Sequence, residues 1–155
     1  MAQHRLLFVC LGNICRSPIA QGVFGDVAAR AGMADRFFLD SAGTGTWHIG
    51  NPPDPRAAAA AARRGIDISG QRARQVRAHD FSDFDLLLAM DRTNQSDLCA
   101  LAPEPHTAGI RLFLADAPEL GVAEVPDPYF GGNDGFEEVL DLVEAGSRAL
   151  LARLA

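Results

Sequence analysis

Cys10 and Arg16, six positions apart, are the residues of this sequence best suited to do chemistry. The apolar run 6–9 precedes them and a helix-like segment follows, so a buried strand leads through a tight loop to a helix N-terminus. The backbone N–H groups of such a loop and the helix dipole attract an oxyanion and favour the thiolate form of Cys10. The planar guanidinium of Arg16 can bind two oxygens of a phosphate. The segment therefore predicts phosphoryl transfer through a cysteine.

A purely structural interpretation of the same segment also exists. Cys10 would then be a buried thiol and Arg16 a surface charge. The spacing of the two residues is weak evidence for a site on its own, because it arises by chance in an arginine-rich chain. Ser17 and Pro18 favour the functional interpretation. Serine is a preferred helix N-cap and proline suits the first helical position, so we expect a helix to begin there.

Composition and charge predict one domain spanning residues 1–155. The chain is 48% hydrophobic, which is enough apolar material for a core, and its net charge of −6 disfavours nucleic acid as a partner. Three cysteines, an odd number, fit a reducing compartment better than a disulfide framework. No apolar run approaches the roughly 20 residues that cross a bilayer, and the N-terminus lacks a signal-peptide pattern. We therefore expect a cytoplasmic protein with no membrane partner.

Strand-like and helix-like segments alternate along the chain, which predicts an α/β fold with a parallel sheet. Strands are expected at residues 5–9, 37–39, 84–90 and 110–114. Helices are expected at 18–32, from Pro55 to a stop at Gly65, at 92–102, and from a capping-box start at Asp134 and Glu137 to the C-terminus. Residues 115–133 are expected to form a loop. The predicted architecture is a single three-layer domain with a four-stranded parallel sheet flanked by helices, and its phosphate-binding loop follows the first strand.

Asp127 is the candidate general acid. Displacing an alkoxide or phenolate from phosphorus requires a proton for the leaving oxygen. Asp127 lies between Pro126 and Pro128, which stiffen the backbone and restrict the direction of its carboxyl group. The Asp-Pro dipeptide is equally typical of an ordinary turn, so the local sequence leaves both interpretations open.

Four segments in order resemble the low-molecular-weight protein tyrosine phosphatases. They are Cys10-Leu-Gly-Asn-Ile-Cys-Arg-Ser-Pro18, Ser41-Ala-Gly-Thr44 followed by Trp47, the strand end at Met90-Asp91, and Asp127-Pro128-Tyr129. The resemblance covers essentially the whole chain, and the loop together with the distant Asp-Pro-Tyr is a specific combination.

The resemblance implies a set of catalytic roles. Cys10 would be the nucleophile that becomes a phosphocysteine, and Arg16 and the loop amides would hold the phosphoryl oxygens. Ser17 would hydrogen-bond the sulfur and help it leave. Asp127 would protonate the leaving group and then act as base for the water that hydrolyses the intermediate.

The resemblance also implies supporting residues around the loop. Asn13 would fix the loop shape, with Ser41 bonding to it from the neighbouring strand end. Trp47 and Tyr129 would form the substrate rim and stack on an aryl ring. Four further positions, Leu11, Gly12, Ile14 and Cys15, would complete the phosphate-binding loop.

The expected substrate is a phosphotyrosine-containing protein, with a bacterial tyrosine kinase as one candidate, and the expected state is a monomer or a weakly self-associating protein. No cofactor or metal is implied, because Arg16, the amides and the dipole supply the positive charge. The four histidines, His4, His48, His79 and His106, show no metal-ligand spacing, and His48 is expected to be a solvated loop residue.

Three residues depart from the family pattern or add to it. Gln71 stands near a position where many relatives carry histidine, and we expect this to loosen the surroundings of the loop. Phe130 takes the place of a second tyrosine after Asp-Pro. Cys15 can form a reversible disulfide with the nucleophile, which predicts redox-sensitive activity.

Three other functions remain as alternatives. An arsenate reductase on the same fold needs two further cysteines, and only Cys99, expected to be buried and inert, lies outside the loop. A phosphate- or phosphotyrosine-binding module without turnover would not need Asp127. A thiolate metal site would rest on Cys10 and Cys15 alone, beside the cationic Arg16.

Overall fold

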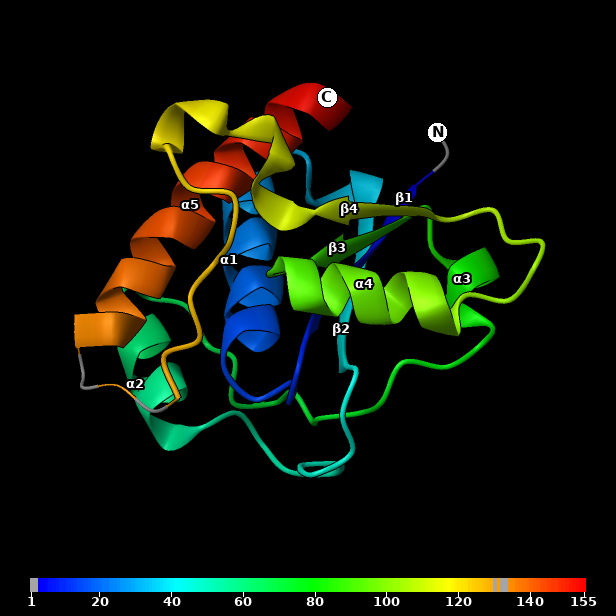
Figure 1. Cartoon of the computed structure of the whole chain (residues 1–155). Coiled ribbons are helices and arrows are strands. Elements are labelled where there is room, and N and C mark those ends of the chain that lie inside the picture. Colours follow the sequence, from blue (N-terminus) through cyan, green and yellow to red (C-terminus); the bar gives the residue numbers. More distant parts are fainter. Residues whose placement is uncertain (1–2, 130, 132–133) are drawn as a thin grey trace.

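Four parallel strands form the centre of the structure in the order β2-β1-β3-β4 (Figure 1). The structure is a computed structural model that describes residues 3–129, 131 and 134–155. The strands are β1 (His4–Cys10), β2 (Phe37–Gly43), β3 (Leu86–Ala89) and β4 (Gly109–Leu112). Strand β1 lies inside the sheet, and its residues 6–10 are all buried. This explains its unbroken apolar run, which is typical of a parallel strand covered on both faces.

Helices cover both faces of the sheet, as Figure 1 shows. They are α1 (Arg16–Arg30), α2 (Pro55–Arg63), α3 (Asp80–Asp83), α4 (Arg92–Leu101) and α5 (Asp134–Leu154). Side chains alternate along β1: Leu6 and Phe8 join a core with α1 and α5, whereas Leu7 and Val9 join a second core with α3 and α4. The predicted three-layer α/β domain is therefore confirmed. Among the described residues, no helix combines the length and the apolar character needed to cross a membrane.

The helix-end signals that the sequence carries at α2 are present in the structure. Asp54 is the N-cap, its carboxylate accepting the Arg56 N–H at 2.8 Å, and Pro55 is the first helical residue. Gly65 follows the helix with φ +79°, and Gly32 follows α1 with φ +72°. Glycine is favoured at both positions because the left-handed conformation carries no steric penalty there.

Several expected boundaries were wrong. Strand β2 runs on to Gly43, four residues beyond the expected end at residue 39. Phe113 and Leu114, expected as strand, instead begin a 3-10 helix (Phe113–Asp116) and are buried facing Gly146 of α5. A second 3-10 helix, Pro118–Leu120, lies within the expected loop, and a third, Ala34–Arg36, precedes β2.

Cys99 in α4 was expected to be buried, and Asp134 and Glu137 were expected to cap the start of α5. Cys99 is exposed, not buried, because α4 turns only its inner face, with Asn94 and Leu98, toward the sheet. The cap expected from Asp134 lies outside the described side chains. Glu137, its expected partner, accepts hydrogen bonds from Arg63 and Arg64 of the α2 region.

Candidate active site

The loop between β1 and α1 takes its shape from Asn13. Asn13 has φ +58°, a left-handed conformation that asparagine tolerates better than most residues. Its Nδ2 donates to Ser17 Oγ at 2.8 Å and to Ser41 Oγ at 2.9 Å. Its Oδ1 accepts the backbone N–H of Arg74 at 3.0 Å. The buried amide thus ties the loop to helix α1, strand β2 and the segment before α3.

The loop lies directly on the end of strand β2. The N–H of Thr44 donates to the Cys10 carbonyl at 3.0 Å, and the N–H of Gly45 donates to the Leu11 carbonyl at 2.9 Å. A Cβ at Gly43 would lie 2.7 Å from the Leu11 oxygen, so residue 43 must be glycine for this close approach.

Cys10 lies at the end of β1 with its sulfur facing two hydrogen-bond donors. Sγ is 3.3 Å from the Asn13 backbone N–H and 3.0 Å from Ser17 Oγ. Ser17 Oγ accepts from Asn13 Nδ2, and its own proton is free to donate to the sulfur whenever the sulfur is a thiolate, which can only accept. A sulfur that accepts two hydrogen bonds is suited to carry negative charge.

Helix α1 does not begin at the expected residue, and the difference leaves the Ser17 hydroxyl available to contact the Cys10 sulfur. The helix begins at Arg16, residue 15 occupies the N-cap position, and no side chain caps it. The expected N-cap, Ser17, is instead fully buried within the helix. Its hydroxyl bonds the nucleophile rather than the helix end.

Arg16 is held almost completely out of solvent, with its side chain 4% exposed. Its Nη1 donates to Asp91 Oδ2 at 2.7 Å and to the Val125 carbonyl at 3.1 Å. Burial opposes the positive charge, but Cys10, Asp91 and Asp127 outweigh it and raise the pKa of the guanidinium above its usual value. Arg16 therefore stays charged and fixed beside the sulfur.

Asp91 is a functional residue whose role was not predicted from the sequence. It follows strand β3 at the same edge of the sheet as Cys10, and one carboxylate oxygen caps α4 through the Asn94 N–H at 2.8 Å. The other oxygen holds Arg16. The available signal was its position directly after a buried strand.

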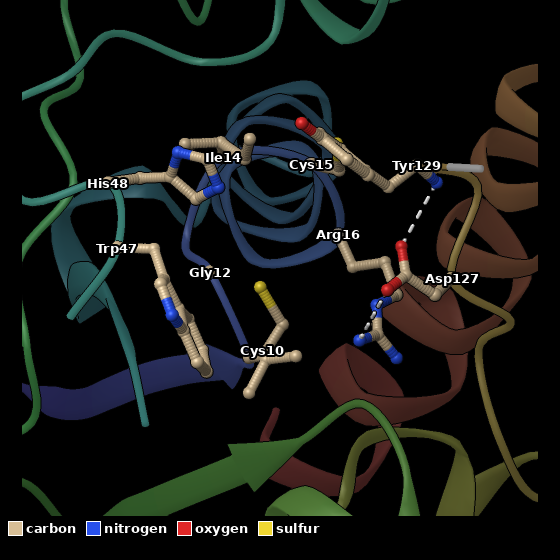
Figure 2. Close-up of a pocket in the computed structure, with 10 residues that line it drawn as sticks. Cys10, Gly12, Ile14, Cys15, Arg16, Trp47, His48, Asp127 and Tyr129 are labelled. Atoms are coloured by element: carbon tan, nitrogen blue, oxygen red, sulfur yellow. Dashed lines mark hydrogen bonds and ion pairs between the residues drawn. The ribbon is translucent and has the colours of Figure 1, made fainter. Parts of the chain in front are cut away.

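Asp127 reaches the site from the long loop before α5. Its Oδ1 accepts the Tyr129 N–H at 3.0 Å, and its Oδ2 lies 3.7 Å from Nη2 of Arg16. The loop is held just before this point by the Val125 N–H, which donates to the Met90 carbonyl at 2.8 Å. Figure 2 shows the Asp127 carboxylate directed at the Arg16 guanidinium, across the pocket from Trp47.

These residues surround a cavity of about 270 Å³, a size that suits one side-chain-sized group rather than a large ligand. Ten residues line it: Cys10, Leu11, Gly12, Ile14, Cys15, Arg16, Trp47, His48, Asp127 and Tyr129. The expected nucleophile, cation, acid and rim are thus brought together. Asn13, Ser17 and Ser41 lie behind the wall and hold the loop. Within the described ranges, no cluster of three or more His, Cys, Asp or Glu side chains could bind a metal.

Two further residues singled out in the sequence lie at or beside the site. His48 lines the pocket, with its ring 6.1 Å from that of Tyr129, rather than standing free in a solvated loop (Figure 2). Gln71 donates to the Pro18 carbonyl at 3.0 Å and accepts the Ser41 hydroxyl at 3.2 Å. It therefore bridges helix α1 and strand β2, and the expectation that it loosens the surroundings of the loop stays a prediction. Phe130 lies outside the described residues.

Cys15, next to Arg16, is a buried thiol on the pocket wall. Burial raises its pKa to about 12, and the negative groups of Asp54, Cys10 and Asp127 add to the effect. At neutral pH it is therefore a protonated thiol, in contrast to what the nucleophile requires.

Comparisons with known proteins agree with this geometry. The family model described as low molecular weight phosphotyrosine protein phosphatase matches residues 5–155. The chain is 46% identical over 149 residues to the low molecular weight protein-tyrosine-phosphatase YfkJ of Bacillus subtilis, covering 96% of this chain and 94% of the relative. The crystal structure of YfkJ superposes with a TM-score of 0.92, at 43% identity, covering 99% of this chain and 96% of that one. A protein tyrosine phosphatase from Entamoeba histolytica with Hepes in the active site gives 0.93 at 37% identity, covering 98% and 97%.

Proposed function

Because the chain belongs to the low molecular weight phosphotyrosine protein phosphatase family, we propose that it hydrolyses phosphotyrosine through a covalent intermediate on Cys10. The chain is a phosphatase of the cysteine-dependent type. The observation that carries the assignment of roles is the meeting of Cys10, Arg16 and Asp127 around one small cavity.

The first step transfers the phosphoryl group to sulfur. The dianion binds to the loop N–H groups and to Arg16, and the Cys10 thiolate attacks phosphorus from below. The S–P bond forms as the bond to the phenolic oxygen breaks. Asp127, in its protonated form, gives its proton to that oxygen, so the leaving group departs as a neutral phenol.

The second step regenerates the enzyme. The Asp127 carboxylate takes a proton from a water molecule that attacks phosphorus, and the S–P bond breaks to release inorganic phosphate. Ser17 and the Asn13 N–H stabilise the departing thiolate through the contacts at 3.0 and 3.3 Å. No step requires a metal or a cofactor.

The pocket supports an aryl ester as the substrate. The nucleophile is at the bottom, with Cys10 3% exposed, whereas Trp47 and Tyr129 at the mouth are 71% and 37% exposed. Leu11 and Ile14 add apolar surface to the wall of the pocket. An aromatic ring can pass this rim and stack on it, and the shorter phosphoserine side chain reaches less deeply.

The substrate class can be tested with matched phosphopeptides. With reduced protein and a metal chelator, we expect kcat/KM for a phosphotyrosine peptide to exceed that for the phosphoserine peptide of the same sequence by about 10²-fold or more. Phosphate release measures both rates. Absence of phosphotyrosine turnover would refute the proposed function, and equal rates would refute the aryl preference.

The proposal extends to the setting of the enzyme. The substrate is a tyrosine-phosphorylated protein, for which a bacterial tyrosine kinase is a candidate, in keeping with the 46% identity to the Bacillus subtilis relative. A cytoplasmic location fits a mechanism that needs a reduced Cys10, and all three cysteines are free thiols. The protein acts as a monomer or with weak self-association.

Peroxide is expected to inactivate the enzyme reversibly. It oxidises the Cys10 thiolate to a sulfenic acid, and the Cys15 sulfur then displaces water to form a disulfide that a dithiol reduces. In Cys15→Ser the sulfenic acid lacks this partner and proceeds to sulfinic acid, so less activity returns. The pKa of Cys15 is about 12, so the fraction of its reactive thiolate form increases as pH rises. The share of activity that wild type recovers should therefore also increase with pH. Activity after peroxide and then dithiothreitol measures both effects; equal recovery of the two proteins would contradict the disulfide.

A further inference from the structure

We propose that Arg56 is a positioning residue for the general acid, which it holds at a fixed place relative to the phosphate-binding loop. The inference rests on the proposed role of Asp127 as the acid. Arg56 is the second residue of α2 and does not line the pocket, so it acts through the segment that carries Asp127.

The first contact is between the guanidinium and the backbone just after Asp127. Nη2 of Arg56 donates to the Tyr129 carbonyl at 3.0 Å, and Nη1 lies 3.5 Å from the Gly131 carbonyl. The N–H of Tyr129 in turn donates to Asp127 Oδ1 at 3.0 Å. Arg56 therefore fixes the residue whose backbone orients the acid.

The same guanidinium lies between two aromatic rings. Its Cζ is 5.6 Å from the centre of the Tyr129 ring and 5.0 Å from that of Phe136 in α5. Both distances are within the range of a cation–π interaction. The loop that follows Asp127 and the start of α5 thus pack against one side chain.

Arg56 is also linked, through Asp54, to the phosphate-binding loop. Asp54 binds Arg56 in a bidentate fashion, at 3.1 Å to Nε and 2.9 Å to Nη2, and the hydrogen bonds from Arg56 lower the pKa of the Asp54 carboxyl. The backbone N–H of Asp54 donates to the Ile14 carbonyl at 2.8 Å. A continuous path therefore runs from the loop of the nucleophile, through Asp54 and Arg56, to the loop of the acid.

This path completes a two-sided support for Asp127. On the N-terminal side of Asp127, the backbone of Val125 is held by hydrogen bonds with the Met90 carbonyl and with Arg16. On the C-terminal side of Asp127, the carbonyl of Tyr129 accepts a hydrogen bond from Arg56. Because a misplacement of about 1 Å can cost up to about 10²-fold in rate, losing one support should weaken proton donation specifically.

The test uses aryl phosphates whose phenols differ in acidity. For Arg56→Ala, Arg56→Lys, Asp127→Asn and the double variant Arg56→Ala/Asp127→Asn, kcat/KM is measured across the series, because it includes departure of the leaving group. The inhibition constant for inorganic phosphate reports on the phosphate-binding loop. Arg63→Ala is the matched control, since Arg63 lies on the same helix and pairs with Glu137 away from the site.

We expect Arg56→Ala to lose about tenfold with weakly acidic phenols and less than about twofold with strongly acidic ones, which need no proton. Phosphate inhibition should not change. Arg56→Lys keeps the charge but carries its donors on one nitrogen, so it loses the bidentate contact with Asp54 that accompanies the bond to Tyr129, and it should fall between wild type and alanine. The double variant should be no slower than Asp127→Asn, because the two changes remove one function.

Other results would overturn the inference. An equal loss with every ester, or weaker phosphate inhibition, would give Arg56 a general structural role. If Asp127→Asn depends on the leaving group while both Arg56 variants behave like Arg63→Ala, only the positioning role is wrong. If Asp127→Asn itself shows no such dependence, the acid assignment falls and the positioning role falls with it. Arg56→Lys decides the question should the alanine variant fail to fold.

Discussion

Serine in place of Cys10 is expected to abolish turnover of an aryl phosphate, with a loss in kcat of about 10⁴-fold or more. The oxygen of serine must lose its proton to attack, and the groups that contact this position, the Asn13 N–H and the Ser17 hydroxyl, are donors rather than bases. Arg16 and the loop N–H groups are unaffected by the change. The variant should therefore still bind phosphate.

This combination of lost turnover and retained binding is measured by steady-state hydrolysis and by phosphate titration calorimetry. Cys99→Ser is the matched control, because Cys99 is an exposed thiol on α4 and should have no effect. Residual turnover within about tenfold of wild type would exclude a phosphocysteine, since only the nucleophile is so sensitive to one atom.

Asparagine in place of Asp127 is the second change with a large expected effect, a loss of about 10²–10⁴-fold for esters of weakly acidic phenols. The carboxyl group must be protonated to donate, so in wild type activity falls as rising pH removes that proton. The amide of the variant has no such proton to lose, and the alkaline limb should flatten.

The measurement is kcat/KM against pH with one strongly and one weakly acidic phenol. Asp67→Asn, which removes an exposed carboxylate bound to Ser69, controls for the change in net charge. The same loss with both phenols, or an unchanged alkaline limb, would show that Asp127 is not the acid.

The architecture was predictable where one strong local signal decided it. The run 6–9 is apolar at every position, which requires a strand buried on both faces, and this is where β1 lies. Asp54-Pro55 and Gly65 delimit α2 through their own backbone preferences. These signals place Cys10 at the carboxyl edge of the sheet without any knowledge of distant contacts.

Residues whose partners are remote in the chain could not be predicted in the same way. Ser17 has the properties of an N-cap, yet it bonds Cys10 and Asn13 because the loop brings them within 3.0 Å. Phe113 continues an apolar run, but contact with α5, not β-propensity, sets its conformation. Arg56 and Asp91 are charged residues at helix starts, and only the tertiary structure directs them to Tyr129 and Arg16.

The immobilisation of Arg16 has a consequence for the end of the catalytic cycle. Its guanidinium is already oriented by Asp91 and the Val125 carbonyl, so the loss of about 2 kcal/mol of side-chain freedom occurs on folding rather than on binding. The benefit is the same for any dianion that presents three oxygens in a pyramid. Inorganic phosphate presents them as the ester does, so the product is expected to compete with substrate for the same site, and the fraction of enzyme that is free in a cell depends on how little phosphate is present.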